Sequence, residues 1–217
     1  MVARNGKKKP RVPVAPEGWP FIAIPAAIAA GLALGGRRVL AVPFAAAALA
    51  SLGFFRDPER DTPALPGIVL SPADGRVMSV EEVDDPFVGP SVRVATFLSP
   101  LDVHVNRSPI AGLVVKVTYS RGRFLAAYRP EAGQVNERCV VNLQGDSSRI
   151  TVVQIAGVVA RRIVCRVGPC DKLAAGERFG LIRFGSRTDC YMPRGTHVTV
   201  QAGDRVTGGV TALGISA

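Results

Sequence analysis

The sequence predicts a mainly β fold: a compact multi-stranded β domain of the sandwich or barrel type (a barrel-sandwich hybrid), preceded by an N-terminal apolar helical hairpin. From Thr62 onward, short apolar runs alternate with Gly, Pro and Asp turns at intervals of roughly ten residues, as in all-β domains. Two apolar stretches, 19–35 and 39–55, precede this part. Neither a Gly-x-Gly-x-x-Gly nor a Gly-Lys-Ser loop occurs, so a nucleotide-binding α/β fold has no support.

Residues 1–18 form a basic, proline-containing N-terminus that we expect to be flexible. The chain has a formal net charge of +10, and most of the excess lies in its first sixth, beside the apolar stretches. That distribution favours an anionic membrane surface as partner. No nucleic-acid-binding motif and no aromatic-rich basic stripe occurs, so we expect no nucleic-acid partner.

Residues 19–56 are predicted to be a membrane-associated helical hairpin. Each apolar stretch has about 17 residues, the lower limit for spanning a bilayer, and contains one proline, Pro25 or Pro43. A two-pass hairpin would place the basic pair 37–38 on the far side, against the positive-inside tendency. We therefore favour a hairpin that enters one leaflet, with a two-pass hairpin and a cleaved signal peptide as alternatives.

Residues 57–217 are predicted to be the β domain. The expected strands are 68–70, 75–83, 91–98, 103–106, 112–120, 138–143, 149–156, 162–167, 178–184, 189–192, 196–200 and 209–213, with room for a short helical turn near 124–128. Four cysteines occur without a Cys-x-x-Cys pair, and there are only two histidines. We therefore expect reduced cysteines and no metal site.

The dipeptide Gly185-Ser186 could cut its own backbone. Glycine leaves its carbonyl unshielded and tolerates strained dihedral angles, so the following serine hydroxyl can attack that carbonyl. Elimination from the resulting ester leaves a pyruvoyl group on a new N-terminus. The preceding apolar strand would deliver this bond to a defined place.

Two further segments could supply acid–base groups. Asp74 follows an apolar strand in Ser-Pro-Ala-Asp-Gly, where its carboxylate could orient a histidine or activate a nucleophile, or simply form a turn. In an extended segment Asp102, His104 and Asn106 share one face, which makes His104 the best proton shuttle of the chain. We expect His197 to be structural.

Together these segments resemble the phosphatidylserine decarboxylases in their short prokaryotic form. The resemblance is carried, in order, by Phe55-Arg56-Asp57-Pro58-Glu59-Arg60, Ser71-Pro72-Ala73-Asp74-Gly75, the segment 98–107, Asn136-Glu137-Arg138 and Gly185-Ser186. It implies decarboxylation of phosphatidylserine to phosphatidylethanolamine through a pyruvoyl Schiff base. The proenzyme is expected to cleave itself into a β chain, 1–185, and an α chain, 186–217, with Ser186 becoming the covalent pyruvoyl cofactor.

The resemblance also implies the partners and the location. We expect phosphatidylserine in an anionic membrane as substrate, and the α and β chains of one precursor as partners; a homodimer is left open. The catalytic domain is expected on the cytoplasmic side of the cell membrane, bound peripherally or monotopically. Asp74, His104 and Ser186 are the expected catalytic residues, and Asp102, Asn106, Arg107 and Phe184 are expected near the substrate.

One position departs from the family pattern. Longer relatives carry His-x-x-His in the central motif, and the second histidine, usually assigned to self-cleavage, falls on Arg107 here. Arginine stays protonated and cannot act as a general base. Either His104 serves both steps, or self-cleavage uses Asp74 or another group.

Three other classes of protein were weighed. The main alternative is a non-catalytic, membrane-anchored β module that binds lipid or protein, which would stay uncut. A lipoyl-type carrier needs a lysine on a hairpin tip, and no lysine follows Lys172. A zinc peptidase would need more ligands than two isolated histidines supply.

Overall fold

The chain forms two units, Met1–Glu59 and Arg60–Ala217. The computed structural model describes residues 13–158, 162–183 and 185–216. Most of the predicted flexible N-terminus, residues 1–12, therefore lies outside the described residues.

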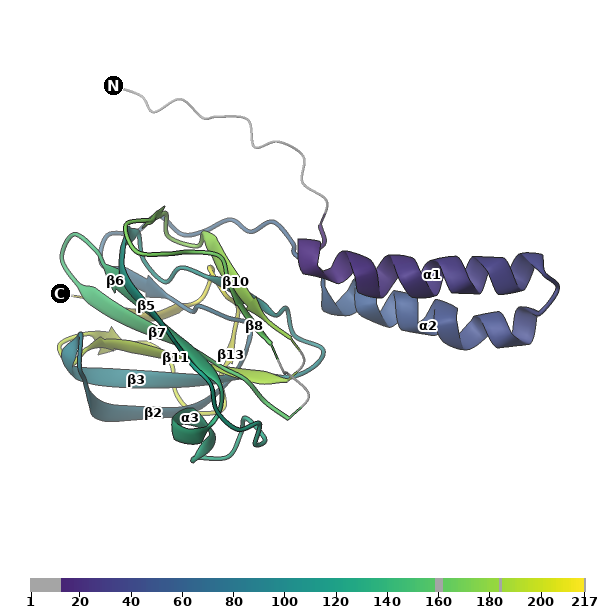
Figure 1. The fold of residues 1–217 in the computed structure, drawn as a ribbon. Coiled ribbons are helices and arrows are strands. Elements are labelled where there is room, and N and C mark those ends of the chain that lie inside the picture. Colours follow the sequence, from purple (N-terminus) through teal and green to yellow (C-terminus); the bar gives the residue numbers. More distant parts are fainter. Residues whose placement is uncertain (1–12, 159–161, 184, 217) are drawn as a thin grey trace, which may run out of the picture. The chain divides into compact units, whose positions relative to one another are not determined.

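Two helices that run side by side make up most of the first unit (Figure 1). A 3-10 turn, Pro16–Gly18, leads into α1 (Trp19–Leu34), and α2 (Arg38–Phe54) returns along it. Both follow the predicted apolar stretches, and Pro25 and Pro43 lie inside them without ending them. Most of their large apolar side chains are exposed, so these helices present bare apolar surface.

Length and apolar composition allow one of these segments to cross a membrane. Pro16–Leu34 meets both criteria, whereas Arg38–Phe54 is slightly shorter. This gives weak support to membrane association of the first unit. The choice between a hairpin in one leaflet and a two-pass hairpin stays a prediction.

The second unit is built almost entirely of strands, so the predicted mainly β class is confirmed (Figure 1). The strands are β1 (Ile68–Leu70), β2 (Gly75–Asp85), β3 (Gly89–Leu98), β4 (Val105–Arg107), β5 (Gly112–Ser120), β6 (Arg138–Gln144), β7 (Arg149–Ile155), β8 (Ile163–Cys165), β9 (Lys172–Leu173), β10 (Arg178–Ile182), β11 (Ser186–Pro193), β12 (His197–Val198), β13 (Arg205–Val206) and β14 (Ala212–Ile215). One short helix, α3 (Ala132–Val135), precedes β6.

The strands form one large curled sheet and two small ones. The large sheet has the order β13-β2-β3-β11-β7-β6-β5-β9, and the small sheets have the orders β4-β10-β8 and β1-β14-β12. All of these pairings are antiparallel. Strand β11 lies near the centre of the large sheet, between β3 and β7.

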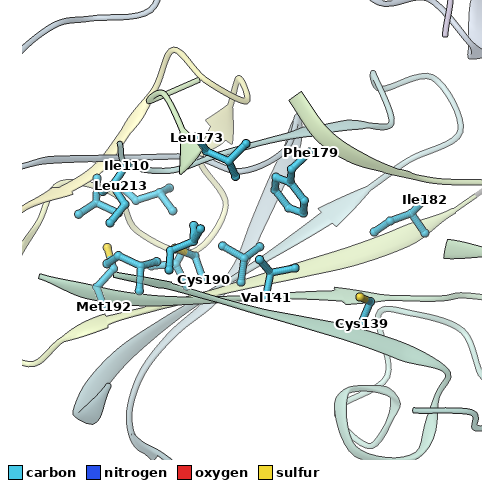
Figure 2. Close-up of a cluster of buried hydrophobic side chains, with 14 of the residues drawn as sticks. Ile110, Cys139, Val141, Leu173, Phe179, Ile182, Cys190, Met192 and Leu213 are labelled. Carbon is cyan, nitrogen blue, oxygen red and sulfur yellow. The ribbon is translucent and has the colours of Figure 1, made fainter. Parts of the chain in front are cut away.

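Alternation of buried and half-buried residues explains why these segments become strands. In β6, Cys139, Val141 and Leu143 are buried, while the residues between them are partly exposed. In β11, Cys190 and Met192 point into the apolar cluster (Figure 2). The core therefore lies against one face of the large sheet, and every second residue of β11 faces it.

The structure differs from the predicted elements at several places. The helical turn expected near 124–128 is reduced to one hydrogen-bonded turn, in which the Arg129 N–H donates to the Ala126 carbonyl, while the Asn136 side chain bonds both backbone groups of Leu125. The strand expected at 189–192 already begins at Ser186, paired with Leu98. The two-residue strands β9 and β13 were not predicted, since such short pairings leave no periodic signal.

Candidate functional site

The Gly185-Ser186 peptide bond lies at the start of β11. Ser186 pairs with Leu98 of β3, and the register of β11 with β7 continues from Arg187 opposite Ile155. Gly185 has a φ angle of +64°, a left-handed conformation that glycine adopts without steric cost. The chain thus makes a glycine turn directly before a rigid central strand.

The carbonyl oxygen of Gly185 lies against Gly157, just after β7. A Cβ atom on Gly157 would overlap that oxygen, well inside van der Waals contact. The register of the two strands, extended by two residues, brings these glycines opposite each other. Only a residue without a side chain leaves room for the carbonyl in this position.

The hydroxyl of Ser186 is the candidate nucleophile. Its side chain is fully buried, and its Oγ atom has no hydrogen-bond partner among the described residues. A buried hydroxyl without a partner is energetically unfavourable, and such groups concentrate at sites of chemistry. Covalent geometry places it next to the carbonyl carbon of Gly185.

The ring of His104 lies next to the backbone N–H of Gly185. Its ring is fully buried, and Nδ1 is 2.8 Å from the carbonyl oxygen of Asp102. Nδ1 therefore carries the proton, and Nε2 is left as an acceptor. The Gly185 N–H donates to this Nε2 atom at 3.4 Å. A proton acceptor is thus held within reach of the Gly185-Ser186 bond.

Asp102 orients His104 through its backbone rather than its carboxylate. The residue lies in a turn before β4, not in the extended segment that was predicted. Its carboxylate accepts hydrogen bonds from Ser99 N–H and Oγ and is paired with Arg205 at 2.6 Å. Burial acts to raise the pKa of Asp102, but the bonds from Ser99 and Arg205 outweigh it and lower this pKa.

Asp74 is held in an ion pair. Both of its carboxylate oxygens accept from the guanidinium of Arg60, at 2.6 and 2.7 Å, and one also accepts from the Gly208 N–H at 2.8 Å. The two side chains are largely buried, with 16% and 8% exposed. Arg60 also donates to the Gly208 carbonyl, so the pair fixes the loop around residue 208.

The other expected substrate residues have different surroundings. Asn106 is fully buried, and its Oδ1 atom accepts from Gln154 Nε2 at 2.7 Å. Arg107 is buried, and its guanidinium donates to the Gly176 carbonyl at 3.1 Å. Phe184 lies outside the described residues.

A buried ion pair lies on the face of β11 opposite to Ser186. Arg187 donates two hydrogen bonds to Asp189, at 2.6 and 2.7 Å, and both side chains are almost fully buried. Both partners belong to β11, so the pair compensates two buried charges beside the candidate cleavage site.

Two residues of the site were not singled out from the sequence. Asn136 donates to the Ala156 carbonyl at 2.7 Å and so holds the segment that leads to Gly157. Asn136 belongs to the Asn-Glu-Arg motif, which contributed to the family resemblance but was assigned no role from the sequence. Gly157 had no signal, because a lone glycine after a strand is common.

The arrangement contains a candidate nucleophile, a carbonyl in a left-handed glycine turn and a proton acceptor. No group of three or more metal-ligating side chains occurs among the described residues. A hydroxyl, a carbonyl and a proton acceptor are the groups that acyl transfer by a serine requires.

Known proteins match the chain over almost its whole length. The family model for phosphatidylserine decarboxylase matches residues 48–214. A phosphatidylserine decarboxylase proenzyme of Symbiobacterium thermophilum is 49% identical over 204 residues, which cover 93% of this chain and 94% of the relative. Proenzymes of the same name from Nitrosomonas europaea and Desulfotalea psychrophila are 46% and 43% identical, covering 92% and 95% of this chain and 94% and 98% of those relatives.

Proposed function

The chain belongs to the phosphatidylserine decarboxylase family and is a phosphatidylserine decarboxylase, and we propose that it first cleaves itself between Gly185 and Ser186. Ser186 then becomes the pyruvoyl group on which decarboxylation depends. The observation that carries this proposal is the left-handed Gly185 turn, whose N–H faces His104 Nε2 while Ser186 Oγ lies buried without a partner among the described residues.

Self-cleavage begins with proton transfer from the Ser186 hydroxyl to Nε2 of His104. The freed Oγ attacks the Gly185 carbonyl carbon, the C–N bond breaks, and the nitrogen takes up a proton, so that an ester replaces the peptide bond. Loss of the Ser186 Cα proton then expels the carboxylate of Gly185 from Cβ. Hydrolysis releases ammonia and leaves a ketone at Cα of residue 186.

The residues around the scissile bond fit this chemistry. Gly157 leaves room for the Gly185 carbonyl in its present orientation, and the Arg187–Asp189 pair compensates the buried charges that follow Ser186. Holding the reacting atoms in a near-attack geometry reduces the entropy cost of reaction. The small fragment then remains anchored in the sheet through β11 after the backbone is cut.

We assign the base for self-cleavage to His104. Both carboxylate oxygens of Asp74 are engaged by Arg60, and Arg107 cannot lose its proton under ordinary conditions. Asp74 supports the reaction from this ion pair by fixing the loop that contains Gly208.

Decarboxylation uses the same histidine. The pyruvoyl group supplies a ketone that condenses with the amine of the lipid and withdraws the electron pair of the breaking bond to the carboxylate. Nε2 of His104 would take up the proton that the lipid ammonium loses on condensation and then give it to the substrate Cα atom, from which carbon dioxide has left. Its tautomer is fixed by the Asp102 carbonyl throughout.

The helices of the first unit serve to keep the enzyme at its substrate. Exposing lipid acyl chains to water costs about 0.8 kcal/mol per methylene, so the enzyme must work at the bilayer. The apolar surface of α1 and α2 and the positive N-terminal segment suit an anionic cell membrane. We place the catalytic unit on its cytoplasmic side. A purely binding β module does not explain the decarboxylase relatives.

Intact-mass analysis of the denatured full chain tests this proposal. The wild type should give the fragments 1–185 and 186–217, the latter of 32 residues with a blocked first residue. Ser186→Ala should remain whole, while Ser147→Ala, in an exposed turn, should be cut as the wild type is. Borohydride reduction in the presence of labelled phosphatidylserine should attach the label only to the short fragment. An uncut wild-type chain in an active preparation would overturn the proposal.

A further inference from the structure

A row of polar side chains crosses the core face of the large sheet next to Ser186. Thr188 of β11 pairs with Thr96 of β3 on one side and with Gln154 of β7 on the other. Thr188 lies on the same face as Cys190 and Met192, which point into the apolar core (Figure 2). Gln154 reaches across to the small sheet, where it donates to Asn106 of β4.

Each member of this polar row has an atom without a hydrogen-bond partner among the described residues. These atoms are Thr96 Oγ1, Thr188 Oγ1, Asn106 Nδ2 and Gln154 Oε1, and all four residues are 99% or more buried. Buried polar atoms normally have partners, because desolvation without a new bond costs about 1–3 kcal/mol for each group. Four such atoms in a single row indicate a binding site for a polar group.

The polar row is within reach of the proposed reaction centre. Thr188 follows Ser186 by two residues on the same face of β11, a separation of about 7 Å between Cα atoms. Leu98, the partner of Ser186 on β3, is fully buried beside it. A substrate bound at residue 186 would thus contact the apolar side chain of Leu98 and would have the polar row about 7 Å away along β11.

The chemistry of the polar row selects its ligand. Two hydroxyls and one amide N–H can donate, and one amide oxygen can accept. Turning both amides over leaves again one free donor and one free acceptor in the Asn106–Gln154 pair. An α-amino acid group matches this set, because its carboxylate can accept from the three donors and its nitrogen can donate to the one acceptor.

We propose that Thr96, Thr188, Asn106 and Gln154 bind the α-carboxylate of the serine head group and so select amino-acid head groups for decarboxylation. This inference rests on the proposed function of Ser186. The row contains no formal charge, which suits a carboxylate that must leave as neutral carbon dioxide. An arginine in this position would stabilise the charged ground state and raise the barrier.

Equilibrium binding to enzyme that has been reduced with borohydride tests the inference without relying on turnover. Reduction of the ketone to an alcohol prevents condensation, so only non-covalent binding of soluble short-chain lipids is measured. Thr188→Val and Thr96→Val should each bind phosphatidylserine about tenfold more weakly, because one hydrogen bond to a charged group is lost. Binding of phosphatidylethanolamine, which lacks the carboxylate, should be unchanged.

Matched variants separate the possible outcomes. Thr188→Ser keeps the hydroxyl and should bind both lipids as the wild type does, and so should Thr118→Val on the exposed part of β5. Equal losses for both lipids, or no loss in either valine variant, would overturn the inference. A valine variant that stays uncut while the wild type matures would also overturn it, since the row would then serve self-cleavage. Failure of the wild type to mature would instead overturn the proposed function.

Discussion

The backbone N–H of Gly185 points at Nε2 of His104, and 3.4 Å separates two nitrogen atoms that lie 81 residues apart in the chain. The other ring nitrogen is held by the Asp102 carbonyl, so the proton-accepting edge of the imidazole faces the scissile turn. This one relationship connects the central polar motif with the glycine-serine dipeptide. It supports our proposal that His104 is the base for self-cleavage.

His104→Ala should stop both reactions. Without a proton acceptor the chain should remain uncut, and carbon dioxide release should fall by at least about 100-fold. Intact mass measures cleavage, and the release of labelled carbon dioxide, which needs the cleaved chain, should fall with it. His197→Ala is the matched control, because His197 is the only other histidine and is exposed. Cleavage of His104→Ala at the wild-type rate would assign the first step to another base.

Local sequence patterns were sufficient for most strands but not for the geometry of the site. A run rich in β-branched and apolar residues predicted the limits of β5 correctly. The pairing of Asp74 with Arg60 and the packing of Gly185 against Gly157 depend on long-range sheet register. The sequence predicted that Asp102 lies in an extended segment and shares a face with His104. The chain instead turns at Asp102, and the Asp102 carboxylate accepts hydrogen bonds from Ser99.

Gly157→Ala should block maturation. The φ angle of Gly157 lies outside the left-handed region, so alanine costs little in backbone strain, but its methyl group overlaps the Gly185 carbonyl oxygen. The carbonyl must move away from its place, and cleavage should slow by about 100-fold, as expected for a displacement of about 1 Å. The ratio of cut to uncut chain over time measures this.

Gly168→Ala is the control for that variant. Nothing lies within 4 Å of a Cβ atom on Gly168, and its φ angle is also outside the left-handed region. This variant should mature at the wild-type rate. Equal rates for Gly157→Ala and Gly168→Ala would mean that the contact with the carbonyl has no part in cleavage.

Cys165 should be the cysteine that reacts as a thiolate near neutral pH. Its hydrogen bond with the thiol of Cys139 lowers the pKa of Cys165 to about 7 despite partial burial, and the same bond raises the pKa of Cys139. Alkylation of Cys165 by iodoacetamide should therefore rise with pH with a midpoint near 7 and level off about one to two pH units higher. Peptide mapping of the labelled chain gives this profile. Cys139, which is buried, should stay unlabelled, and a midpoint near 9 at Cys165 would contradict the shift.

Arg60 and Asp74 should behave as a single unit in a double-mutant cycle. Because both side chains are largely buried, Arg60→Ala or Asp74→Ala leaves an uncompensated charge and should each cost about 3 kcal/mol of unfolding free energy. That corresponds to a fall of about 6–12 °C in Tm for a chain of this size. The double variant removes both charges and should lose much less than the sum.

Maturation should follow the same pattern, since both residues hold the loop at Gly208. If Asp74→Ala alone slowed cleavage and Arg60→Ala did not, Asp74 would act on the reacting atoms directly.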